Sequence, residues 1–214
     1  MPWYVFALSD ERPRAAAGVG LGGALTARAV PGGFAIVERR ADVPPVEFGT
    51  LRTHDAVVAR VADMVPAILP VRFGTLVELE DLEEMLTDRE AEISEALDRV
   101  RGRVQFTWRG PASVRGRARA GRPAKSGTDY LRRAARSASG VPPAPFRRLR
   151  DAFGSLIAAQ RYQAAAGVIP ESLYHLVNRT DGARYMRLAR KASVDGSLSV
   201  KGPFPPFAFT PELI

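Results

Sequence analysis

The chain has 214 residues and a formal net charge of +8, with 46% hydrophobic and 25% charged residues. These values are ordinary for a globular protein, and the length suits one large or two small domains. Cysteine is absent, which excludes disulfides, thiolate nucleophiles and cysteine-based metal sites. No apolar run approaches the roughly 18 residues of a membrane span, and the first residues lack the basic region of a signal peptide, so we expect a cytoplasmic protein.

The charge is distributed unevenly along the chain. Residues 1–100 carry a net charge of −7, residues 101–150 carry +13 and residues 151–214 carry +2. The basic character of the protein therefore comes from one middle segment and not from a uniformly basic surface.

Residues 1–101 predict an N-terminal α+β domain with a mixed sheet. Aromatic and β-branched runs indicate strands, Pro31-Gly32-Gly33 indicates a hairpin turn, and apolar residues at helical spacing indicate two helices. In chain order, the predicted elements are strands at 3–8, 25–30 and 34–39, a helix at 53–65, a strand at 71–77 and a helix at 80–101.

Residues 102–202 predict a second domain. The predicted elements are a strand at 103–109, a mobile basic loop at 110–127, helices from 128 and from 145 to about 165, a weak strand near 166–169, a strand at 172–178, a helix at 183–192 and a strand at 197–202. Strand, helix, two strands, helix and strand is the order of a ferredoxin-like unit. The fold class is thus α+β, with a modified ferredoxin-like second domain. We expect the proline- and phenylalanine-rich tail, 203–214, to dock on the N-terminal domain, because phenylalanines in a free tail would lower solubility.

Three segments carry a resemblance to a known family. They are residues 53–58 (THDAVV) followed by 68–75 (ILPVRFGT), residues 127–131 (GTDYL), and residues 201–209 (KGPFPPFAF). In order and spacing they resemble the gas vesicle protein F/L (GvpF/GvpL) family across nearly the whole chain. Phe204 and Phe207 stand where that family usually has Trp and Tyr.

The resemblance implies an accessory protein for gas vesicle assembly that binds the shell protein GvpA or other accessory Gvp proteins. It brings no catalytic residues, and we expect no enzyme activity, cofactor, metal or membrane partner. The candidate partner-binding residues lie in the 69–75 segment and the tail: Leu69, Val71, Arg72, Phe73, Phe204, Phe207 and Phe209. His54 and Arg72 are predicted to be structural polar residues, with the Arg72 guanidinium bracing its strand to the acidic helix 80–101.

Other motifs favour ordinary structural interpretations. Residues 18–23 fit the G-x-G-x-x-G pattern of dinucleotide sites, but no strand leads directly into them and no helix follows, so we interpret them as a flexible loop. Residues 116–121 have the glycine spacing of a phosphate-binding loop but lack the Lys-Ser/Thr that should follow. His54 and His175, the only histidines, are too few for a zinc site.

Two alternatives to the assembly role stay open. The arginine-rich 103–150 region could bind nucleic acid, because arginines neutralise phosphates, although few aromatic side chains interleave with them for base stacking. The second alternative is that the protein is a small-molecule enzyme on a ferredoxin-like scaffold, because a fold does not determine a function.

Overall fold

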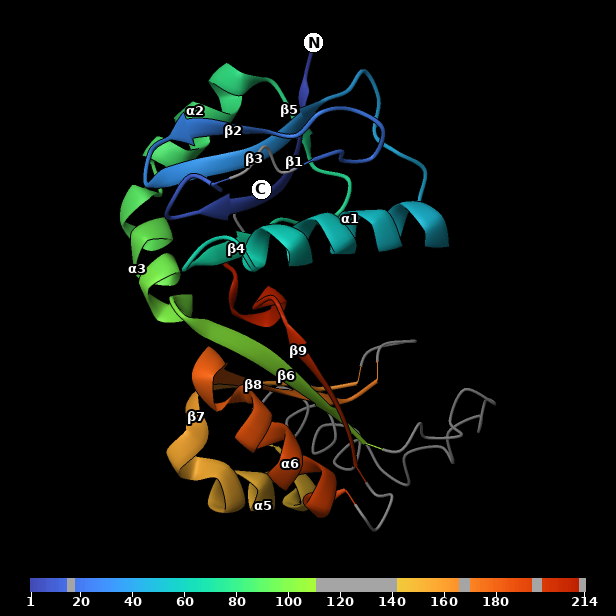
Figure 1. Ribbon diagram of the computed structural model, residues 1–214, viewed down its shortest axis with the longest axis vertical. Helices are drawn as coiled ribbons and strands as arrows, with labels where there is room; N and C mark the ends of the chain where they lie inside the picture. The colour runs from blue at the N-terminus through green and yellow to red at the C-terminus, as the bar shows by residue number, and fades with distance from the viewer. Residues whose placement is uncertain (15–17, 111–141, 166–169, 194–197, 212–214) are drawn as a thin grey trace, which may run out of the picture. The chain divides into compact units, whose positions relative to one another are not determined.

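A computed structural model describes residues 1–14, 18–110, 142–165, 170–193 and 198–211 (Figure 1). The chain divides into two compact units. Unit 1 comprises Met1–Val104 and the segment from Phe204 on, and unit 2 comprises Gln105–Pro203. The predicted basic loop lies outside the described residues except for Gly110, as does the helix predicted from 128.

The sheet of unit 1 has the strand order β2-β3-β1-β4, with β5 also paired to β1. Its strands are β1 (Trp3–Ser9), β2 (Thr26–Val30), β3 (Gly33–Arg39), β4 (Ile68–Pro70) and β5 (Leu76–Val77). All of these pairings are antiparallel, so the predicted mixed sheet is wrong. The reason is that β3 and β4 do run parallel to each other, but β1 is inserted between them and is antiparallel to both.

Strand β1 is the centre of unit 1. Every one of its residues is buried, and because successive side chains of a strand point to opposite faces, both faces of the sheet must be covered. One face contributes Tyr4 and Phe6 to a core that includes Val57, Val58 and Val61 of helix α1 (Phe48–Ala62). The β2–β3 turn contacts α3 (Glu90–Val100), since a Cβ on Gly32 would lie 3.3 Å from the Ile93 side chain.

The helices of unit 1 differ from the prediction at two places. Helix α1 begins at Phe48 and not at Thr53, with Glu47 before it. The predicted helix 80–101 is two helices, α2 (Leu79–Thr87) and α3, separated by a tight turn in which the Arg89 N–H bonds to the Leu86 carbonyl. The apolar spacing continues across that turn, through Leu86 to Ile93, and therefore indicates one helix from sequence.

The sheet of unit 2 has the order β7-β8-β6-β9, formed by β6 (Arg103–Arg109), β7 (Ile157–Gln163), β8 (Ser172–Asn178) and β9 (Ser199–Phe204). Read from β9, this is the fourth, first, third and second strand of the unit, which is the order of a ferredoxin-like fold. The predicted α+β class is confirmed, and this strand order is compatible with the predicted ferredoxin-like second half. Residues 157–163 form a strand although a helix was predicted there, because edge pairing with β8 overrides the helix preference of an alanine-rich segment.

Helices α5 (Ala144–Phe153) and α6 (Gly182–Ala192) share an aromatic core with β6. The Phe153 ring of α5 lies 5.1 Å from the Tyr185 ring of α6, and Tyr185 in turn lies 4.4 Å from Phe106. The buried faces of both helices therefore meet over the same part of the sheet. A Cβ on Gly202 of β9 would come within 2.8 Å of the Gln105 carbonyl oxygen, so glycine allows β9 to approach β6 closely.

The last described segment belongs to unit 1. After β9, the short 3-10 helix η4 (Phe207–Phe209) lies against β4, and Phe209 is buried while Phe207 is exposed. Among the described residues, the helices are too short or too polar to cross a membrane. The domain limits predicted from sequence stay a prediction.

Candidate partner-binding site

The sequence motif at residues 68–75 corresponds to an interrupted strand. Strands β4 and β5 both pair with β1, and the chain between them bulges out as the loop 71–75, which we call the β4–β5 loop. Both ends of the loop keep a backbone bond to β1, from the Val71 N–H to the Phe6 carbonyl (2.9 Å) and from the Val5 N–H to the Thr75 carbonyl (3.0 Å). Gly74 has φ +92°, a conformation that favours glycine.

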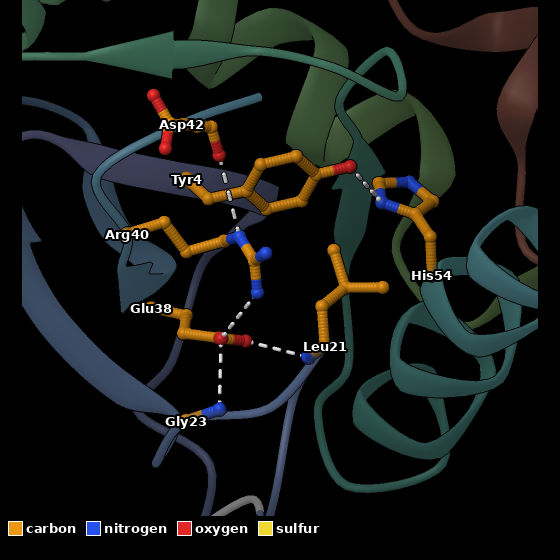
Figure 2. Close-up of polar contacts among 7 residues, drawn as sticks. All are labelled: Tyr4, Leu21, Gly23, Glu38, Arg40, Asp42 and His54. Atoms are coloured by element: carbon orange, nitrogen blue, oxygen red, sulfur yellow. Dashed lines mark hydrogen bonds and ion pairs between the residues drawn. The ribbon is translucent and has the colours of Figure 1, made fainter. Parts of the chain in front are cut away.

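Two buried side chains hold the β4–β5 loop in place. The Tyr4 hydroxyl accepts from the Gly74 N–H (3.1 Å) and donates to His54 Nδ1 (2.9 Å), as Figure 2 shows for the pair. Burial lowers the pKa of His54, which favours the neutral ring with a proton left on Nε2, and His54 also bonds to the Val71 backbone. Burial raises the pKa of Tyr4, so its hydroxyl keeps its proton. His54 thus links residues 53–58 to residues 68–75, the two parts of the first family motif.

The candidate residues from sequence divide into buried and accessible groups. Leu69, Val71 and Phe209 are buried, so they can contact a partner only if unit 1 opens. Phe73 is half-buried, with its ring 5.6 Å from His54. The accessible candidates are Arg72, Phe204 and Phe207.

Arg72 does not occupy the predicted position. Its side chain is exposed, and in the described part of the chain it makes no ion pair with α2 or α3. Strand β4 ends at Pro70, and the chain at Arg72 has already left the sheet, so its guanidinium is directed to solvent and not along the apolar strand.

An apolar surface at the start of α1 was not predicted from the sequence. Val43, Val46, Phe48 and Leu51 are 52%, 79%, 76% and 37% exposed, and they fall within nine residues. We call these four residues the α1 patch. The sequence did offer a signal for Phe48, which lies in the first turn of the helix and outside its buried stripe.

The α1 patch adjoins the β4–β5 loop. A Cβ on Gly74 would lie 3.6 Å from Val43 Cγ1, so Val43 packs beside the loop that carries Arg72. The Thr50 hydroxyl, which donates to the Pro45 carbonyl (2.6 Å) and accepts from the Glu47 N–H (3.2 Å), fixes the chain between Val43 and Phe48. The Arg52 guanidinium lies over the Phe48 ring at 5.5 Å. The patch therefore has a fixed backbone, with Arg52 beside Phe48 and the β4–β5 loop beside Val43.

The glycine-rich segment 18–23 has a structural role that the sequence did not reveal. Glu38 is 1% exposed, and its carboxylate accepts from the Leu21 N–H (2.6 Å) and the Gly23 N–H (2.8 Å) and pairs with Arg40 (3.2 Å) (Figure 2). The segment thus wraps around a carboxylate of its own chain, which leaves those N–H groups unavailable to a phosphate. The interpretation as a plain flexible loop is wrong for its described residues.

Unit 2 contains a second buried polar chain. The Trp108 indole N–H donates to the Tyr185 hydroxyl (2.6 Å), which donates to His175 Nδ1 (2.6 Å). His175 Nε2 is buried and has no hydrogen-bond partner in the described structure. Burial lowers the pKa of His175 to about 4 and raises that of Tyr185, so both groups stay neutral at physiological pH. In the described residues, no three His, Asp or Glu side chains gather as metal ligands.

Changing Tyr4 to Phe is expected to destabilise the protein by about 2 kcal/mol. The substitution leaves the Gly74 N–H and the Val71-bound His54 ring without their shared partner, and unsatisfied buried groups cost about 1–3 kcal/mol. Chemical denaturation of the purified variant measures this loss in the free energy of unfolding. As a control, Tyr174→Phe removes a half-buried hydroxyl that bonds only to the Gln163 side chain, and should cost less than about 1 kcal/mol. Equal losses in the two variants would contradict the role of Tyr4.

The fold and its buried networks define a two-unit α+β protein whose internal polar groups brace loops beside an exposed apolar surface. The sequence profile described as gas vesicle synthesis protein GvpL/GvpF matches residues 2–211, and the chain belongs to that family. No curated protein is matched by sequence.

Two solved structures are similar in fold. The crystal structure of gas vesicle protein GvpF from Anabaena sp. PCC7120 has a TM-score of 0.72 at 13% identity, covering 98% of this chain and 96% of that one. The crystal structure of GvpF from Microcystis aeruginosa has a TM-score of 0.73 at 11% identity, covering 97% and 98%. Family membership supports a gas vesicle-related role.

Proposed function

We propose that this protein is a cytoplasmic accessory factor for gas vesicle assembly that works by binding the shell protein GvpA, with other accessory Gvp proteins as further partners. The observation that carries the proposal is the α1 patch. Large apolar side chains exposed together on a folded protein mark interaction sites, because leaving them in water costs free energy that a partner can recover.

The chemistry of the partner fits this surface. A gas vesicle shell protein is small and very hydrophobic, so before incorporation it has to be kept from aggregating. A surface that covers one apolar helix face of such a protein needs exposed Val, Phe and Leu side chains and a fixed backbone, and it needs no reactive group. Fixing the backbone in advance reduces the entropy lost on binding.

The β4–β5 loop contributes to the same surface in this proposal. The loop that carries Arg72 lies beside Val43, and Arg52 borders the α1 patch beside Phe48. Guanidinium groups at the border of an apolar contact select partners that carry carboxylates beside their apolar face. The tail residues Phe204 and Phe207 are accessible and form a second candidate contact.

Introducing charge into the α1 patch should abolish binding of the shell protein. In Phe48→Glu and Val46→Glu, a charged group would have to be desolvated at the interface, and we expect at least a tenfold loss of affinity. The measurement is co-purification and titration of co-expressed GvpA with each variant. Both side chains are more than three-quarters exposed, so stability should change by less than about 0.5 kcal/mol.

Val19→Glu is the matched control. Val19 is 64% exposed, and its carbonyl is bound by Arg60, which lies near the opposite end of α1 from Phe48. This variant adds the same charge to an exposed valine in the same unit and should bind normally. If GvpA binds Phe48→Glu and Val46→Glu as tightly as it binds the wild type, the α1 patch is not the docking site.

A further inference from the structure

The outer face of the α5 and α6 helices in unit 2 is strongly basic. Its exposed cations are Arg147, Arg148, Arg150, Arg184, Arg187, Arg190 and Lys191, against a single exposed carboxylate on these helices, that of Asp151. In the part of the chain that the structure describes, none of the seven makes an ion pair. Because the buried faces of both helices meet at Phe153 and Tyr185, this face is directed away from the sheet. We call it the basic face.

The outer face of α2 and α3 in unit 1 is strongly acidic. Its exposed carboxylates belong to Glu80, Asp81, Glu83, Glu84, Asp88, Glu90, Glu92, Glu95 and Asp98. The last three pair with Arg89 between the two helices, with Arg99 of α3 and with Arg101 just after α3. The other six make no ion pair with any described residue. We call this surface the acidic face.

We propose that the protein self-associates head to tail, with the acidic face of one copy docked on the basic face of the next. The argument is charge complementarity. Each face is a two-helix surface with unpaired charges of one sign, and the repulsion within each face is relieved when the other covers it. The inference is independent of the α1 patch, which belongs to neither face.

The symmetry of such a contact has a consequence for the product. The two faces are different surfaces, so the contact is heterologous and each added copy again presents one free face of each kind. Head-to-tail association of this kind produces open chains or rings. Every copy in such an assembly would display its own α1 patch, so a row of shell-binding sites would form if the proposed function holds.

The contact should depend strongly on ionic strength. Its charges are solvent-exposed, and salt screens such charges over about 8 Å at physiological ionic strength and about 3 Å at 1 M. We expect the weight-average mass to rise with protein concentration at about 20 mM NaCl and to fall to that of the monomer at about 1 M NaCl. Sedimentation velocity on nuclease-treated full-length protein measures the weight-average mass at both salt concentrations.

Charge reversal tests which faces take part. Arg184→Glu, Arg187→Glu and Arg190→Glu together cancel the net charge of the basic face, and Glu80→Lys, Glu83→Lys and Glu84→Lys together cancel that of the acidic face. Each triple variant alone should stay monomeric at low salt, while an equimolar mixture of the two should form a one-to-one complex, because each variant keeps the face that the other has lost. Circular dichroism and denaturation midpoints confirm that each variant is folded.

Self-association and nucleic-acid binding give different results with these variants. A wild-type protein that stays monomeric at low salt and several hundred micromolar overturns the proposal, as does failure of the two folded triple variants to associate with each other. Binding of DNA or RNA that is lost in the basic-face variant and kept in the acidic-face variant, with no self-association, would assign the basic face to nucleic acid.

Discussion

Replacing Gly20 with alanine is expected to lower the free energy of unfolding by about 3 kcal/mol. A Cβ at this position would lie 2.0 Å from Glu38 Oε2, well inside contact distance. The carboxylate cannot move freely, because it is buried and accepts from the Leu21 and Gly23 N–H groups. The chain must shift and break these bonds, and overpacking a buried site costs about 1–3 kcal/mol before the lost hydrogen bonds are added.

Gly49→Ala is the matched control for Gly20→Ala. A Cβ on Gly49 in the first turn of α1 meets no atom within 4 Å, and alanine stabilises helices relative to glycine. This variant should be more stable than the wild type by about 0.5 kcal/mol. Urea denaturation of both variants measures the difference. Similar stabilities for the two would show that the glycine-rich segment adapts without cost and that Glu38 does not fix it.

The second large effect expected is acid destabilisation through His175. Its pKa is lowered to about 4 in the folded protein, from 6.5 for the free side chain, and burial is the cause. The unfolded chain therefore binds a proton in a pH range where the folded protein does not. The neutral His175 ring therefore makes its full contribution to the free energy of unfolding above pH 6.5, and this contribution is lost as the pH falls toward 4. At 1.36 kcal/mol per pH unit, this amounts to about 3 kcal/mol.

His175→Gln tests this assignment. Glutamine can still accept from the Tyr185 hydroxyl but does not titrate, so the variant should lose about 3 kcal/mol less than the wild type between pH 7 and pH 4. Carboxylates titrate in both proteins, so the difference between the two pH profiles isolates the histidine. His54→Gln serves as a comparison, because the pKa of His54 is also lowered by burial. Parallel profiles for the wild type and His175→Gln would contradict the assignment to His175.

Much of the fold follows from local patterns in the sequence. The apolar run at Trp3–Ser9 and the glycine turn at 31–33 are local signals, and both strands of the β2–β3 hairpin lie where they were predicted. Residues 157–163 show where such reasoning fails, because their alanines favour a helix and only pairing with β8 makes them a strand. The antiparallel arrangement of the first sheet depends on the insertion of β1 between β3 and β4, which no local pattern encodes.

The candidate site was less predictable than the fold. The sequence pointed to residues 69–75 and to His54, but not to the bond between Tyr4 and His54, since the two residues are 50 positions apart. A single glutamate at the end of a strand, such as Glu38, usually faces solvent, and only the approach of the glycine-rich segment makes it a buried acceptor. Exposure of Phe48 depends on which side of α1 meets the sheet.

Unit 1 is made from both ends of the described chain, because the segment from Phe204 belongs with residues 1–104. During translation, strand β4 is synthesised about 140 residues before η4, the helix that lies against it. The synthesis of unit 2 is therefore complete before Phe209 of unit 1 has been added to the chain. A nascent chain that ends before Pro205 would lack η4, so β4 would be without the cover that this helix gives it.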